Sequence, residues 1–129
     1  MKLLIFTILI TFLAGCKSNR KPDCICTMEF RMITVEITDS LNNPLTKLET
    51  RTIDQFGRTI VPLNKKLDYQ PNNYVIADDS NIPLLSTTPI SVIFIVTDSV
   101  KSKNYFYTLN TDECKCHINK LDGPTKIIF

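Results

Sequence analysis

The chain of 129 residues contains no tryptophan, one histidine and three glycines. Only Gly57 and Gly123 follow residue 15, so the glycine-rich loops that hold phosphate groups are missing. Neither G-x-S-x-G nor H-E-x-x-H occurs, and these motifs carry the nucleophile of many hydrolases and the zinc ligands of many proteases. We therefore expect a protein that is not an enzyme and that uses no cofactor.

The chain also lacks a large excess of either positive or negative charge. Lys and Arg number 15 against 13 Asp and Glu, which gives a formal net charge of +2 at pH 7. Lys17, Arg20 and Lys21 lie close together, but we interpret this short basic segment as solvated chain rather than as a site for acidic lipid headgroups. Without a basic stripe, nucleic acid is excluded as an expected partner.

The N-terminus does carry a clear signal. Lys2 precedes an uncharged apolar run over residues 3–13, and Leu13-Ala14-Gly15-Cys16 follows the pattern of a bacterial lipoprotein signal. The run is shorter than the roughly 20 residues that cross a bilayer as a helix. We expect cleavage before Cys16, a diacylglyceryl thioether on its sulfur and a further acyl chain, such as palmitate, on its amine. Several acyl chains anchor a protein stably to a membrane.

This interpretation divides the chain into three parts. Residues 1–15 form the signal peptide that is removed, 16–23 form a lipidated tether, and 24–129 form one domain. Lys17 directly follows the anchor, whereas an aspartate there retains enterobacterial lipoproteins in the inner membrane. The tether also lacks an acidic cluster of the kind associated with surface export. We expect an outer-membrane lipoprotein of the cell envelope whose domain faces the periplasm.

Four cysteines remain once Cys16 is set aside, and they form two C-x-C pairs, Cys24 with Cys26 and Cys114 with Cys116. In an exported protein we expect two disulfides between these pairs. Residues i and i+2 of a strand share a face, so antiparallel pairing gives 24–116 with 26–114 and parallel pairing gives 24–114 with 26–116. We prefer the antiparallel set. The alternative is a zinc site with His117, although C-x-C is a poor zinc-binding spacing.

Alternating Thr, Ile, Val, Phe and Tyr residues predict strands throughout the domain, and no window after the signal has the period of an amphipathic helix. A change of register near Met32 and Ile33 predicts a bulge. A strand is predicted at 90–97, and because residues 90–96 are nearly all apolar, it is expected to be the central strand, covered on both sides. The remaining strands are predicted at 28–37, 47–53, 58–62, 73–78, 103–110, 114–119 and 125–129. Seven or eight short strands with regular turns indicate an all-β sandwich.

Two irregular stretches, 64–73 and 79–89, are the longest predicted loops, and loops on a rigid sandwich often bind ligands. Asp78 and Asp79 adjoin the second stretch. As neighbours in a strand they point to opposite faces, which is unsuitable for paired acid/base catalysis. If the strand ends there, they are weak candidates for binding Ca²⁺ together with loop oxygens. His117 follows Cys116, and its ring is expected to face away from the sulfurs as an ordinary surface or half-buried side chain.

Two segments resemble the carboxypeptidase regulatory-like domain family. They are residues 35–45, with the sequence VEITDSLNNPL, and residues 52–58, with the sequence TIDQFGR. Residues 74–80 and 116–125 are similar to segments of small lipoproteins of this type in Bacteroidota-like bacteria. The resemblance implies a transthyretin-like or immunoglobulin-like sandwich with an accessory, non-catalytic role, and it carries over no catalytic residues.

Three functions are compatible with these features. The first is a lipid-anchored, non-catalytic binding or scaffold module that attaches to the membrane through Cys16 and presents loops or a sheet edge to a protein or glycan partner. The second is a purely structural envelope lipoprotein. An exposed apolar patch or an open edge strand favours the first over the second. The third is a small hydrolase, which a pocket that gathers Asp78, Asp79 and His117 would favour.

Overall fold

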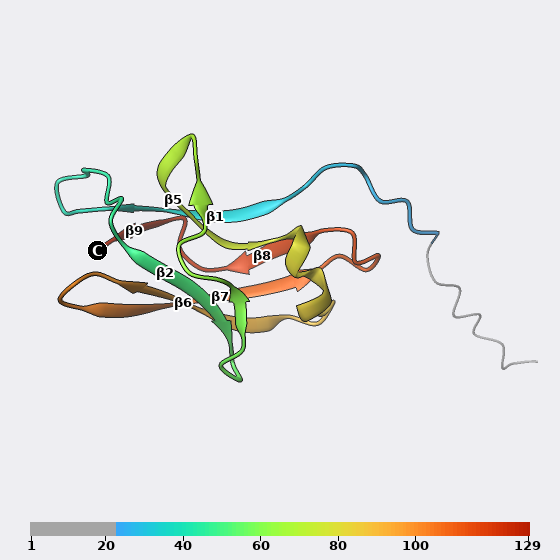
Figure 1. Cartoon of the computed structure of the whole chain (residues 1–129). Coiled ribbons are helices and arrows are strands. Elements are labelled where there is room, and N and C mark those ends of the chain that lie inside the picture. The colour runs from blue at the N-terminus through green and yellow to red at the C-terminus, as the bar shows by residue number, and fades with distance from the viewer. Residues whose placement is uncertain (1–22) are drawn as a thin grey trace, which may run out of the picture.

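In the computed structural model, which describes residues 23–129, two β-sheets pack face to face (Figure 1). The strand orders are β4-β5-β1-β9 and β3-β2-β6-β7-β8. Nine strands and one 3₁₀ helix follow in chain order: β1 (Met32–Thr38), β2 (Glu49–Asp54), β3 (Thr59–Val61), β4 (Lys66–Leu67), β5 (Gln70–Asp78), η2 (Asp79–Leu84), β6 (Ile90–Thr97), β7 (Ser102–Thr111), β8 (Ile118–Asp122) and β9 (Lys126–Ile128). The all-β sandwich is confirmed, with nine strands rather than seven or eight. The predicted signal peptide and Cys16 lie outside the described residues.

Most predicted strands occur within a few residues of their expected bounds, and β6 matches the prediction at both ends. Two predictions were wrong. Residues 28–31 carry no strand, and Met28 and Phe30 are exposed. Residues 114–117 form a turn because Lys115 adopts a left-handed φ of 53°, which interrupts an extended backbone. The alternating apolar pattern of both segments therefore did not reflect pairing in a sheet.

A bulge lies beside the predicted position, but its extra residue is in β5 rather than in β1. The pairing of β1 with β5 shifts register between Ile33 and Thr34. Ala77 pairs with Ile33 and Val75 pairs with Thr34, so the extra residue is Ile76 of β5. β1 itself alternates regularly, which directs Val35 and Ile37 to the interior, where both are fully buried. β1 also pairs with β9 in parallel, whereas the other strand pairs in the two sheets are antiparallel.

The core lies between the two sheets, and β6 contributes three fully buried side chains, Val92, Phe94 and Val96. Phe94 meets the ring of Tyr107 on β7 edge-on, with 6.2 Å between the ring centroids. β6 is central in its sheet, as predicted, but it is not covered on both sides. Ile93 and Ile95 alternate with the core residues and are half-buried on the outer face.

Two glycines adopt positive φ values in turns that follow strands. Gly57 closes the turn after β2 at φ 80°, and the carboxylate of Asp54 accepts hydrogen bonds from the backbone N–H groups of Phe56 and Arg58. Gly123 follows β8 at φ 119°, and a Cβ there would lie 2.2 Å from the ring of Tyr107. Neither turn accommodates another residue without strain. Within residues 23–129, no helix is long and apolar enough to cross a membrane.

Candidate functional site

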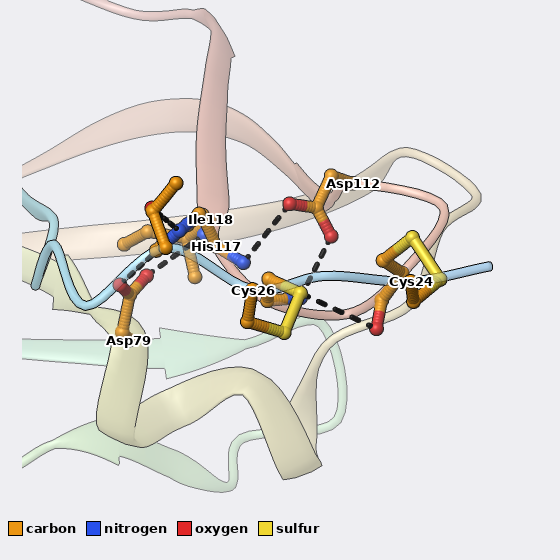
Figure 2. Close-up of a disulfide and its surroundings, with 9 residues drawn as sticks. Cys24, Cys26, Asp79, Asp112, His117 and Ile118 are labelled. Carbon is orange, nitrogen blue, oxygen red and sulfur yellow. Dashed lines mark hydrogen bonds and ion pairs between the residues drawn. A yellow bond between two sulfur atoms is a disulfide. The ribbon is translucent and has the colours of Figure 1, made fainter.

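Two disulfides join the N-terminal segment to the turn between β7 and β8 (Figure 2). They are Cys24–Cys114 and Cys26–Cys116, and each links residues 90 positions apart. The antiparallel connectivity that we preferred is therefore wrong, and the parallel alternative is correct. The geometric reason is that neither C-x-C pair lies in a strand ladder, so antiparallel sheet pairing does not decide the connectivity. Sulfurs in disulfides are not available as the thiolates that zinc requires.

Asp112 organises the turn that carries Cys114 and Cys116. Its carboxylate accepts hydrogen bonds from the backbone N–H of Cys116 at 2.7 Å and of His117 at 3.2 Å. Its backbone N–H donates to the carbonyl of His117 at 3.0 Å, and its carbonyl accepts from Lys115 N–H at 3.0 Å. These four contacts define the conformation of the turn and the position of His117 at its end, and Figure 2 shows the two that the carboxylate accepts.

His117 is not the ordinary surface or half-buried residue that we expected, because it is only 6% exposed. Its Nδ1 lies 2.8 Å from Oδ2 of Asp79, and its Nε2 lies 2.8 Å from Oγ1 of Thr27. Three residues that are far apart in the sequence are thus joined in one line of hydrogen bonds. No motif in the sequence signals this arrangement, because residues 27, 79 and 117 come from a segment without regular structure, the start of η2 and the end of a turn.

Asp79 receives hydrogen bonds from two further donors besides His117. Its Oδ2 accepts from the backbone N–H of Arg31 at 2.8 Å, and its Oδ1 accepts from the backbone N–H of Ile118 at 2.9 Å. Burial acts to raise the pKa of the Asp79 carboxyl, but hydrogen bonds from Arg31, His117 and Ile118 outweigh it and hold the pKa below its ordinary value. The Asp79 side chain is therefore a negatively charged carboxylate near neutral pH.

Asp78 directly precedes Asp79, but its side chain contacts different residues. β5 does end at Asp78, and its fully buried carboxylate pairs with the ammonium of Lys65 and with the N–H and hydroxyl of Ser80. Burial acts to raise the pKa of this carboxyl, but these partners outweigh it and the net shift is downward. Among residues 23–129, no group of three or more His, Cys, Asp or Glu side chains is placed to hold a metal ion.

A surface cavity of about 350 Å³ borders this region. Thr27, Arg31 and His117 lie in its wall. The remaining lining residues are Ile25, Asp112, Glu113, Cys114 and Cys116. We call the region formed by residues 24–31, Asp79 and 112–118 the disulfide end of the sandwich. The structure thus gathers Asp79 and His117 beside a cavity, but Thr27 accompanies them rather than Asp78.

The chain reaches Phe129 at the opposite end of the sandwich (Figure 1). A second cavity of about 420 Å³ lies there. We call residues 39–48, 98–101 and Phe129 the loop end. The lining residues there are Asp39, Pro44, Leu45, Thr46, Lys47, Leu48, Asp98, Lys101 and Phe129. The two stretches that we expected to be loops are partly ordered elements instead: 64–73 contains β4 and the start of β5, and 79–89 begins with η2.

The outer face of the five-stranded sheet carries a row of apolar side chains. Ile53 of β2 pairs with Ile93 of β6, which pairs with Phe106 of β7. Their neighbours along each strand point into the core, so these three side chains face outward. Phe106 is 66% exposed. Sequence periodicity alone did not reveal this row, because it depends on the register between three strands.

Comparison with protein-family models, with curated proteins and with solved structures found no match.

Proposed function

We propose that this protein is a lipid-anchored module of the bacterial cell envelope that binds a partner protein through the outer face of its five-stranded sheet. The observation that carries the proposal is the row formed by Ile53, Ile93 and Phe106. A purely structural module has no need of an exposed Phe106 aligned with the half-buried Ile53 and Ile93, because exposed apolar surface costs free energy in water. Exposed aromatic and aliphatic anchors are the usual centre of protein–protein interfaces.

The surroundings of the row support this function. Ile95, the next outward residue of β6, lines a surface cavity of about 300 Å³ together with Glu49, Arg51, Leu63, Thr50, Thr97 and Ser102. An apolar centre beside a polar and charged rim is typical of a binding surface rather than of a core. A partner with its own apolar side chain and a complementary charged rim would fit. This chemistry favours a protein over a glycan.

The anchor is part of the same proposal. Acylation of Cys16 would attach the domain to the outer membrane close to Cys24, the first residue of the disulfide end. The sheet face would then stand free toward the periplasm. The resemblance to the carboxypeptidase regulatory-like domain family belongs to the proposal too. The turn closed by Asp54 and Gly57 supports it, because it gives a structural role to the matching segment 52–58.

Affinity capture after crosslinking, with tagged full-length protein from detergent-solubilised membranes, tests the binding function. We expect one stoichiometric protein that is retained by wild type and lost with Phe106→Ser. The matched control is Phe56→Ser, because Phe56 is also exposed, at 74%, but lies in the turn after β2. Capture that survives Phe106→Ser, or that fails with both variants, contradicts the proposed surface. Recovery of glycan rather than protein contradicts the proposed partner.

Mass spectrometry of the N-terminal peptide tests the anchor separately. We expect a mature chain that begins at Cys16 and carries diacylglyceryl and acyl groups, and we expect Cys16→Ser to release the protein from the membrane fraction. An unmodified chain that retains residues 1–15 contradicts the proposed anchor. The proposed binding surface is tested independently by the capture experiment.

A further inference from the structure

The hydrogen bonds at the disulfide end fix the direction of each proton. An ionised carboxylate only accepts hydrogen bonds, so Nδ1 of His117 must carry the proton that faces Asp79. In the neutral ring Nε2 is then an acceptor, and the hydroxyl of Thr27 donates its proton to it across 2.8 Å. A hydroxyl therefore points its proton at a base, and a carboxylate orients that base.

This order of hydroxyl, imidazole and carboxylate is the arrangement of a nucleophile, its general base and the group that positions the base. Both distances lie within the range in which proton transfer occurs. His117 and Asp79 are nearly buried, with 7% and 9% of their side chains exposed, whereas Thr27 is exposed to solvent. A substrate can reach the hydroxyl, and water has little access to the two groups behind it.

The covalent structure holds the three groups in place. Cys26 precedes Thr27 and Cys116 precedes His117, so the disulfide between these cysteines joins the residues directly before the hydroxyl and the imidazole. Asp79 in turn accepts a hydrogen bond from the backbone of Ile118, the residue after His117. Pre-organisation of this kind is what catalytic groups require, and it is more than a single surface hydrogen bond would need.

The neighbouring cavity indicates the class of substrate. Arg31 lines it and supplies a positive charge suited to a developing oxyanion, and its two side-chain hydrogen bonds, to Glu29 and Asn119, are both long at 3.5 Å. Asp112 and Glu113 line it as well and disfavour an anionic substrate. The volume of about 350 Å³ suits a small group. A neutral carboxylic ester meets these conditions.

We propose that Thr27 and His117 are catalytic residues, positioned by Asp79, for the hydrolysis of small neutral esters. The Thr27 oxygen attacks the ester carbonyl while its proton passes to Nε2 of His117. The tetrahedral intermediate then expels the alcohol, which takes that proton, and leaves an acyl group on Thr27. Water attacks the acyl group with His117 again as base, which releases the carboxylic acid and restores the Thr27 hydroxyl. This activity goes beyond the binding function and departs from the expectation of a non-catalytic protein.

Covalent labelling of the full-length protein with a fluorophosphonate tests the nucleophile. The Thr27 oxygen displaces fluoride from phosphorus, and peptide mass spectrometry locates the adduct. We expect labelling at position 27 in wild type and in Thr27→Ser, which keeps a hydroxyl. Thr27→Val keeps the side-chain shape but lacks the hydroxyl, so it should form no adduct at position 27. Thr59→Ala, at an exposed threonine of β3, is the matched control and should label like wild type. Absence of label from the Thr27 peptide, or equal labelling of Thr27→Val, overturns the proposal.

Hydrolysis of 4-nitrophenyl acetate tests the role of Asp79. Asp79→Asn presents an amide to Nδ1 and removes the preference for a proton on that nitrogen. We expect kcat to fall by about 100-fold or more while KM changes little, because Asp79 does not touch the substrate. Both disulfides, checked by non-reducing peptide mapping, should persist. An unchanged kcat in a folded variant with intact disulfides contradicts the proposed positioning.

Discussion

The two ends of the sandwich are built from different kinds of contact. At the disulfide end, the two disulfides each join residues 90 positions apart, and Asp79 accepts hydrogen bonds from residues 38, 39 and 48 positions away. At the loop end, Asp39 accepts from the N–H groups of Leu41 and Asn43, and Asp98 accepts from those of Val100 and Lys101. Asp79 at one end therefore has distant donors, whereas Asp39 and Asp98 at the other end have donors within four residues.

This difference bears on both stability and function. Long-range contacts close large loops, so they restrict the unfolded chain strongly, whereas a local turn restricts only the few residues within it. A carboxylate surrounded by distant donors also fixes the relative position of several elements at once. The disulfide end is therefore the part of the fold suited to holding reactive groups at fixed distances. Substitution of Asp39 or Asp98 should therefore cost the rest of the structure less than substitution of Asp79.

The largest expected effect comes from removing both disulfides with Cys24→Ser, Cys114→Ser, Cys26→Ser and Cys116→Ser. The chain-entropy model assigns about 4–5 kcal/mol to a closed loop of this length. Because either bridge alone still closes almost the same loop, loss of one bridge should cost much less than half of the total. Urea denaturation of the variants that lack one, the other or both bridges measures this non-additivity. Equal and additive losses for the two bridges would show that they act independently, contrary to this interpretation.

The next effect should be that of Asp79→Ala. It leaves the Nδ1–H of His117 and the backbone N–H groups of Arg31 and Ile118 without their acceptor, which should lower the free energy of unfolding by about 2–3 kcal/mol. Asp39→Ala is the matched variant at the loop end, where water can replace the lost hydrogen bonds. Urea denaturation should show a far smaller shift for Asp39→Ala. Similar shifts for the two variants would remove the distinction between the ends.

The same contrast explains which features the sequence revealed. The bounds of β6 and the irregularity near Ile33 depend on local patterns, and the sequence analysis predicted both. The contact between His117 and Asp79 joins positions that no local pattern relates. The disulfide connectivity likewise depends on the path of two non-strand segments, so a strand-based argument chose the wrong pairing. The row that includes Phe106 depends on the register between three strands, and this register cannot be read from the sequence.

Acid should weaken the disulfide end through Asp79, and the fold beside it through Asp78. The pKa values of both carboxyls are lowered in the folded state, so the unfolded chain binds more protons than the native protein in acid. Their contribution to stability is complete above the ordinary carboxyl pKa of about 4 and is lost as the pH falls through the folded-state values. Thermal unfolding measured from about pH 2 to about pH 7 should show a shallower acid limb for Asp79→Asn than for wild type. An unchanged slope would mean that Asp79 has the same pKa in both states.

The smallest effect should come from the loop end, with Lys101→Ala. The ammonium of Lys101 lies 4.4 Å from the centroid of the Phe129 ring, and that of Lys103 lies 5.4 Å from it. A cation over an aromatic face at an exposed site contributes about 0.5–1 kcal/mol, and Lys103 remains in place, so a loss near the lower value is expected. Lys47→Ala is the control, because Lys47 lines the same cavity while the cations over the ring are those of Lys101 and Lys103. Urea denaturation should separate the two variants only slightly. A loss of unfolding free energy for Lys101→Ala as large as that for Asp79→Ala would contradict this ranking. It would mean that the contact with Phe129 stabilises the fold as much as the Asp79 carboxylate does.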